Sequence, residues 1–186
     1  MWICCILVLI FIQDPLFPMT NNPKTAHRKV VDWNATFWSG LVAGIFFYCL
    51  NLLLTPLLIG ANEWAMVRLL ASPFLGEQIL APPATLNWGA LSVSVIGTLL
   101  LSLIFTSLIS VVVHKGGLLS GILLGAVLGL ALYAINFYTL TYFFPWFFAM
   151  RSGVMVFVHM VFGAVAGGLY EALEVEVFEE IEEKIA

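Results

Sequence analysis

Three polar side chains, Asn51, Asn136 and His159, lie within runs of otherwise apolar residues that are long enough to cross a bilayer. Polar groups at such depth either hydrogen-bond to neighbouring helices and backbone carbonyls or form a pocket for an ion, a proton or a small solute. The sequence leaves both interpretations open. Because His159 is the one ionisable group deep in a predicted span, the sequence disfavours a proton- or ion-coupled carrier.

A second set of candidate residues, Glu63, Arg68, Trp146 and Arg151, falls in the connections between the apolar runs. They are predicted to share the outer face of the membrane, with the aromatic run 143–148 at headgroup level. Their charges are expected to form a solvated loop surface with an ion pair or two, which contributes little to stability.

The longest connection, after the first apolar run, is predicted to contain one or two helical turns over 63–71. These turns would lie at the membrane interface with Trp64 as an anchor. Pro73, Pro82 and Pro83 are then expected to break regular structure.

No pattern in the sequence indicates catalysis or a cofactor. The 3 histidines lie in different parts of the chain, and the 3 cysteines lack the spacing of a zinc site or a disulfide framework. Seven Lys and Arg oppose 11 Asp and Glu, without a basic stripe for nucleic acid. We therefore expect no enzyme, no catalytic residue, no metal, no cofactor and no nucleic-acid partner.

The elements that position these residues follow from composition. Of 186 residues, 62% are hydrophobic and 10% charged, which is too apolar for a water-soluble domain and makes the lipid bilayer the main solvent. Four apolar runs could each span a bilayer, and backbone groups in lipid must bond within the segment, so each is predicted to be a helix. The predicted spans are 36–59, 89–113, 118–142 and 152–170. The fold class is therefore an all-α four-helix transmembrane bundle over 36–172.

Each predicted helix carries small residues at every fourth position, which lets helix backbones approach closely in lipid. The glycines concerned are Gly40 and Gly44 in the first helix, Gly121, Gly125 and Gly129 in the third, and Gly163 and Gly167 in the fourth. The second helix has Ser or Thr at every fourth position from 94 to 110. These stripes predict a compact bundle, or one that also pairs with other helices. Asn51, Asn136 and His159 fall on the same faces and are expected to point inward.

The two ends of the chain differ from the bundle. The apolar run 1–12 is too short to span. It is either an interfacial or buried anchor, or it precedes a true start at Met19, and with the polar tail it forms an N-terminal segment over 1–35. The last residues, 173–186, predict an amphipathic acidic helix. That helix would be a solvated extension of the fourth span or a docking surface for a partner protein.

Lys and Arg near the span ends predict the orientation. One side holds Lys24, Arg28, Lys29, Lys115 and Lys184, and the other holds Arg68 and Arg151. Both termini are therefore expected in the cytoplasm.

Several segments resemble a family of small bacterial integral membrane proteins that commonly carry the label sodium:proline symporter. They are Ala81-Pro82-Pro83-Ala84-Thr85, Tyr133-Ala134-Ile135-Asn136-Phe137-Tyr138, Phe144-Pro145-Trp146-Phe147 up to Arg151, and His159 with Phe162-Gly163. The resemblance covers roughly 33–173 and implies a bacterial inner-membrane location without an activity. Four spans cannot hold the two repeats that sodium-coupled symporters use, so any transport pathway would need an oligomer.

Taken together, the sequence predicts a non-enzymatic inner-membrane protein that packs against other membrane subunits or against itself. The glycine stripes, the outer aromatic loop and the acidic tail would be its interaction surfaces. The alternative is an oligomeric transporter or channel for a small solute or ion, with Asn51, Asn136 and His159 lining the path.

Overall fold

A computed structural model of the chain describes residues 26–60, 62–175 and 178–181. Within that part, four segments are long and apolar enough to cross a membrane. They are Trp33–Leu54, Trp88–Val113, Leu118–Phe143 and Gly153–Leu173. The all-α four-helix transmembrane bundle is confirmed, with spans close to the predicted bounds. The predicted N-terminal apolar segment lies outside the described residues.

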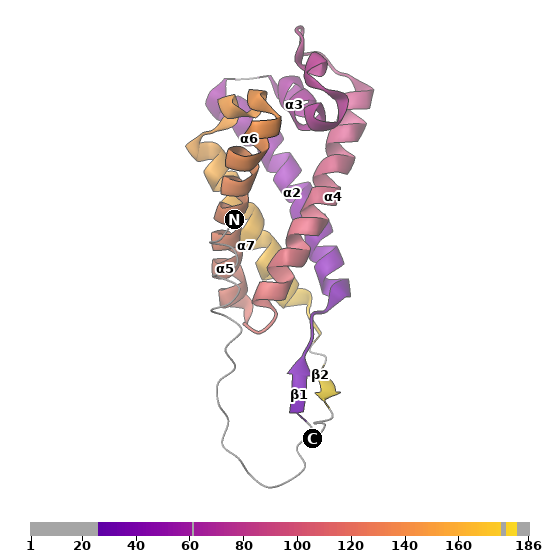
Figure 1. Cartoon of the computed structure of the whole chain (residues 1–186), viewed down its shortest axis with the longest axis vertical. Helices are drawn as coiled ribbons and strands as arrows, with labels where there is room; N and C mark the ends of the chain where they lie inside the picture. The colour runs from indigo at the N-terminus through magenta and orange to yellow at the C-terminus, as the bar shows by residue number, and fades with distance from the viewer. Residues whose placement is uncertain (1–25, 61, 176–177, 182–186) are drawn as a thin grey trace. The chain divides into compact units, whose positions relative to one another are not determined.

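Six α-helices and three short helical segments make up the bundle. The α-helices are α2 (Trp33–Ile59), α3 (Glu63–Leu75), α4 (Trp88–Val113), α5 (Leu118–Ala134), α6 (Leu140–Phe143) and α7 (Gly153–Leu173). Between them lie the 3-10 segments η1 (Glu77–Leu80) and η3 (Pro145–Met150) and the π-helical segment η2 (Ile135–Thr139), which joins α5 to α6. Figure 1 shows α3 and α6 together at one end of the spans, called here the α3 end. The opposite end, where α2 begins after Asp32 and α7 finishes, is called the Asp32 end.

Side-chain caps fix where the long helices begin. Asp32, Asn62, Asn87 and Ser152 precede α2, α3, α4 and α7, and each side chain accepts a backbone N–H from the first turn. Such caps satisfy N–H groups that have no partner within the helix. At the other end of α2, Gly60 adopts a positive φ of 72°, and this left-handed conformation ends the helix.

The expectation that Pro73 breaks regular structure is wrong, because α3 continues through it to Leu75. A proline has no N–H for the carbonyl four residues earlier, here that of Leu69. The hydroxyl of Ser72 donates to this carbonyl at 2.7 Å and replaces the missing bond. The helix therefore keeps its last turn.

The predicted acidic helix over 173–186 also needs correction. α7 ends at Leu173, and Glu174 has the extended backbone angles φ −61° and ψ 131°. Farther along, β2 (Phe178–Ile181) pairs with β1 (Ala26–Lys29) in a two-stranded sheet. Apolar and acidic residues alternate over 173–177, which is the period of a strand. The helical periodicity competes with that alternation, and the extended form prevails in the described residues.

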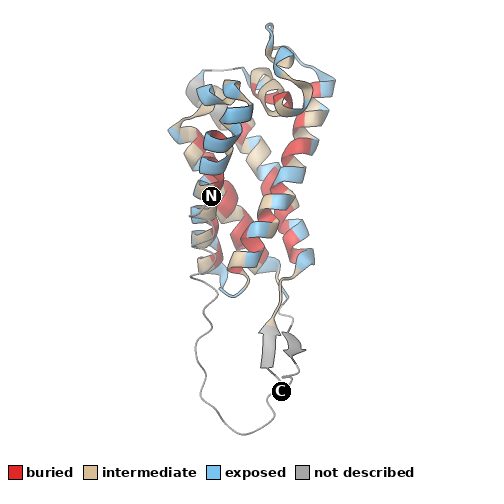
Figure 2. Cartoon of the chain, viewed as in Figure 1, coloured by how far each residue is buried: buried red, intermediate tan, exposed pale blue. Residues whose placement is uncertain are grey.

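α7 is the most buried span. Half of an 18-residue window within it is buried, against 28% of the corresponding window in each of the other three spans. Figure 2 shows the buried residues on the inward faces of the helices and the exposed ones on their outward faces. Large exposed apolar side chains such as Leu100, Ile104 and Leu108 on α4 cover the bundle as expected for a surface in contact with lipid.

Candidate functional site

Glycines bring α5 and α7 into backbone contact over their Asp32 halves. A Cβ atom at Gly125 would overlap the carbonyl of Gly163, and the reverse holds as well. Gly121 meets Gly167 in the same way, and Gly129 meets the carbonyl of His159. This contact is called here the glycine seam. Because both stripes face each other within one chain, the glycines of the seam do not form a surface for another subunit.

The remaining small residues join α2 to α4. A Cβ atom at Gly44 would lie 2.8 Å from the side chain of Ser102. The Ser102 hydroxyl donates to the carbonyl of Gly40 at 2.7 Å, and the hydroxyls of Tyr48 and Ser94 are 2.8 Å apart. Interhelical bonds of this kind contribute about 1 kcal/mol each in a bilayer.

Between the glycine seam and the α3 end lies a cavity of about 340 Å³. Asn51 of α2, Asn136 of η2 and His159 of α7 all line it. By helical rise, Asn51 and His159 lie about 9 to 12 Å along their helices from the α3 end. The structure therefore brings together the three polar residues that the sequence singled out.

Hydrogen bonds define the state of the His159 ring. Its Nδ1 lies 2.8 Å from the carbonyl oxygen of Met155, which can only accept, so Nδ1 carries the hydrogen. Its Nε2 lies 3.3 Å from Nδ2 of Asn136, which can only donate, so Nε2 accepts and the ring is neutral. Asn51 donates one N–H to the carbonyl of Phe47 at 2.9 Å. The amide oxygens of both asparagines have no protein donor in the described part of the chain.

Apart from these groups, the lining is apolar and uncharged. The His159 ring makes edge-to-face contacts with Phe47, Tyr133 and Phe137 at centroid distances of 5.1, 5.7 and 5.6 Å. Thr98 and Ser102 contribute hydroxyls from α4, and no Asp, Glu, Lys or Arg is among the lining residues. The hydroxyls were predicted only as packing residues. Their place on the cavity wall depends on the rotation of α4 relative to α7.

The lining of the cavity reaches the outer surface of the bundle. Phe74 of α3, Leu101 of α4 and Leu140 of α6 line it and are 60%, 44% and 37% exposed, so the cavity extends to the lipid-facing side of these helices. At the α3 end, the indole N–H of Trp146 donates to the hydroxyl of Ser72 at 2.8 Å and ties η3 to α3. The cavity is therefore covered at the α3 end by η3 and α3, and the buried cluster around Ile109, Phe162 and Ala166 packs the interior on its other side.

The outer-face residues do not form the predicted ion pair within the described residues. Arg68 donates instead to backbone carbonyls of the following connection, at Ile79, Ala81 and Thr85. Arg151 donates to Phe137 and Thr141, and Glu63 begins α3 as an exposed residue. Trp146, predicted at headgroup level, is half-buried against Ser72.

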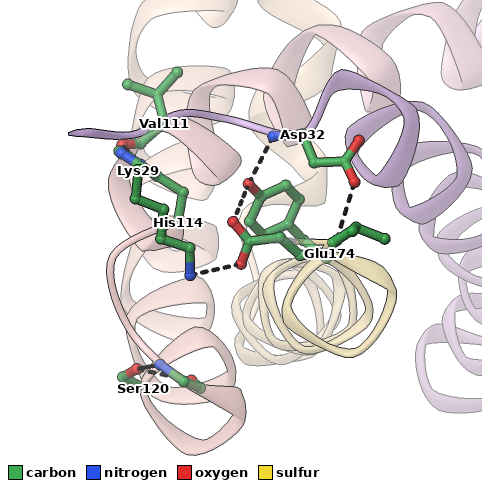
Figure 3. Close-up of polar contacts among 9 residues, drawn as sticks. Lys29, Asp32, Val111, His114, Ser120 and Glu174 are labelled. Carbon is green, nitrogen blue, oxygen red and sulfur yellow. Dashed lines mark hydrogen bonds and ion pairs between the residues drawn. The ribbon is translucent and has the colours of Figure 1, made fainter. Parts of the chain in front are cut away.

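A polar network closes the Asp32 end (Figure 3). The Asp32 carboxylate accepts the backbone N–H of Val175 at 3.1 Å, and the Asp32 N–H donates to the Tyr170 hydroxyl at 3.2 Å. Tyr170 in turn donates to Glu174 at 3.0 Å, and Glu174 pairs with Lys29 at 3.1 Å. This network joins the start of α2 to the end of α7.

The network shifts the pKa of Asp32. Burial raises the pKa of this carboxyl, but backbone N–H groups, including those of Ala35 and Val175, outweigh it and hold the pKa below its ordinary value.

Within the described ranges, no three His, Cys, Asp or Glu residues come together as a metal site requires. Comparison with protein-family profiles, with curated proteins and with solved structures finds no match for this chain. The four apolar helices define a multi-pass membrane protein.

Proposed function

We propose that this chain is a non-enzymatic protein of a bacterial inner membrane that binds a small neutral molecule taken up from the lipid. One observation carries the proposal: Asn51, Asn136 and His159, from three separate segments, share one cavity that extends to the lipid-facing side of the bundle. The resemblance to small bacterial membrane proteins supports the location. The excess of Lys and Arg on one side supports cytoplasmic termini.

The lining indicates the chemistry of the guest. A cavity of about 340 Å³ lies at the lower end of the range for small-molecule sites. Its neutral lining would leave a charged guest without a counter-charge, which is costly in a low-dielectric site. The amides of Asn51 and Asn136 offer oxygen acceptors and N–H donors. The proposed guest is therefore neutral, with an apolar body and one hydroxyl or carbonyl group.

Binding fits the geometry of one chain better than conduction does. Toward the Asp32 end, buried apolar side chains such as Ile109, Phe162 and Ala166 pack together inside the bundle and leave no path there for conduction. A carrier or channel would need a second copy or another subunit to complete a path. Association with such a partner stays a prediction, and the glycines of the seam are not its surface.

The test uses thermal unfolding of the purified chain in mild detergent with 1-decanol as a neutral probe. A guest that binds only the folded state raises the melting temperature and saturates. We expect such a rise with decanol, and none with decanoate or decylammonium, which share its chain and carry a charge.

Two matched substitutions locate the effect. Thr98→Leu fills part of the cavity wall and should abolish the decanol-dependent rise. Thr139→Leu makes the same chemical change at an exposed residue outside the lining and should keep it. A rise of equal size in both variants, or equal rises with all three probes, would contradict the proposal.

A further inference from the structure

The guanidinium group of Arg151, at the α3 end, makes two hydrogen bonds and two aromatic contacts. Its Nε donates to the carbonyl of Phe137 at 2.8 Å, and its Nη2 donates to the hydroxyl of Thr141 at 2.6 Å. The guanidinium carbon lies 4.2 Å from the ring centroid of Tyr138 and 4.6 Å from that of Phe148. Two hydrogen bonds and two aromatic faces therefore fix the orientation of the guanidinium group.

The π-helical segment η2 supplies the carbonyl to which Arg151 donates. Its wider turn alters the hydrogen-bond ladder of the helix, and the Phe137 carbonyl within it accepts both from Arg151 and from the Thr141 hydroxyl, at 2.7 Å. The same hydroxyl accepts from Arg151. The hydrogen bonds thus use one edge of the guanidinium, and Nη1 has no hydrogen-bond partner in the described part of the chain.

The charge of Arg151 is not neutralised by the protein. No carboxylate among the described residues lies within ion-pair distance of it, and the group is only half-exposed. Arg68, the other arginine of this face, differs because Nε, Nη1 and Nη2 all donate to the connection between α3 and α4. A half-buried cation held by neutral groups favours an anion from outside the chain.

The surroundings of Arg151 are aromatic and open to the outside of the bundle. A shallow surface hollow is lined by Tyr138, Thr141, Tyr142, Pro145, Phe148 and Arg151. Tyr142 and Phe148 are largely exposed, at 85% and 64%. These residues lie at the end of a span, where aromatic side chains meet headgroups and upper acyl chains. Arg suits phosphate because its planar fork can donate two parallel hydrogen bonds.

We propose that Arg151 and this aromatic hollow bind the phosphodiester of an anionic phospholipid at the α3 end. The Nη1 side of the guanidinium meets the phosphate oxygens, and the exposed rings of Tyr142 and Phe148 pack on the first carbons of the acyl chains. This site is separate from the cavity, whose lining does not include Arg151. The inference therefore does not depend on the proposed function.

Native mass spectrometry of the full chain in detergent tests the site with three additions: dioleoylphosphatidylglycerol, dioleoylglycerol and inorganic phosphate. Dioleoylglycerol has the same acyl chains without phosphate, and inorganic phosphate is the anion without chains. We expect the unchanged protein to retain phosphatidylglycerol and neither of the other two. Arg151→Gln should retain it about tenfold more weakly, as expected for loss of a charged hydrogen bond.

Lys115→Gln is the control, because it removes one positive charge from the exposed turn between α4 and α5. It should retain phosphatidylglycerol as the unchanged protein does. The proposal would be overturned if Arg151→Gln retained phosphatidylglycerol as well as the unchanged protein does. It would also be overturned if the unchanged protein retained dioleoylglycerol as well as phosphatidylglycerol. If the protein retained inorganic phosphate but not phosphatidylglycerol, the ligand would be free phosphate rather than a lipid headgroup, and the proposal of a lipid site would be wrong. If Arg151→Gln does not fold, the three additions to the unchanged protein still decide the question.

Discussion

The two halves of the bundle use the same pair of helices in opposite ways. In the Asp32 half, α5 and α7 touch through glycines, and a methyl group has no room at Gly125 or Gly163. Toward the α3 end, the next residues on the same stripes are Tyr133 on α5 and His159 and Met155 on α7. These side chains need space between the helices, and the cavity lies beside them. A change of residue size along these two stripes therefore separates a closely packed seam from a cavity.

The largest effect is expected from forcing a methyl group into the seam. Gly125→Ala places a methyl group against the carbonyl of Gly163, where only backbone movement can relieve the overlap. We expect a loss of about 2 kcal/mol or more in the free energy of unfolding, measured by denaturation in mixed micelles. Gly153→Ala is the control, because its Cβ meets nothing within 4 Å. Equal losses in the two variants would mean that the seam is not tightly packed.

A smaller effect is expected from the network that fastens the Asp32 end. Tyr170→Phe removes the hydroxyl that accepts from the Asp32 N–H and donates to Glu174. Because Tyr170 is fully buried, the unpaired groups left behind should cost about 1 to 2 kcal/mol in unfolding free energy.

Tyr142→Phe makes the same change at the α3 end, on a side chain that is 85% exposed. It should leave the melting temperature nearly unchanged. If Tyr142→Phe costs as much as Tyr170→Phe, the two ends do not differ in the way proposed here.

The smallest effect is a pH dependence at the Asp32 end. The folded pKa of Asp32 lies below its ordinary value of 3.8, so the ionised carboxylate stabilises the folded state. This contribution is complete above the ordinary value and is lost as the pH falls through the lower, folded pKa. Asp32→Asn keeps an N-cap oxygen but no titrating charge. Melting temperatures of the two proteins should therefore differ at neutral pH and converge as the pH falls below 3.8 and through the lower, folded pKa of Asp32. Parallel curves over the whole range would contradict this account.

Local sequence was enough for the spans, because a helix in lipid requires a long apolar run and little else. It was also enough to place Asn51, Asn136 and His159 on inward faces, since helical spacing fixes which residues share a side. It failed at Pro73, where a serine hydroxyl replaces the lost backbone bond. It failed again after Leu173, where alternation over 173–177 precedes residues with helical spacing and the described residues are extended.

What the sequence by itself determined is therefore the set of spanning helices, their apolar character and the faces on which small and polar residues lie. The tertiary structure decided which faces meet. It paired the stripe of α5 with that of α7 rather than with another subunit, and it joined Asn136 to His159 across 23 positions of sequence. A glycine stripe predicts only that another helix approaches closely, and a buried amide predicts only that another group forms a hydrogen bond with it. The partner depends on helix rotation and crossing, which are set by all the contacts together.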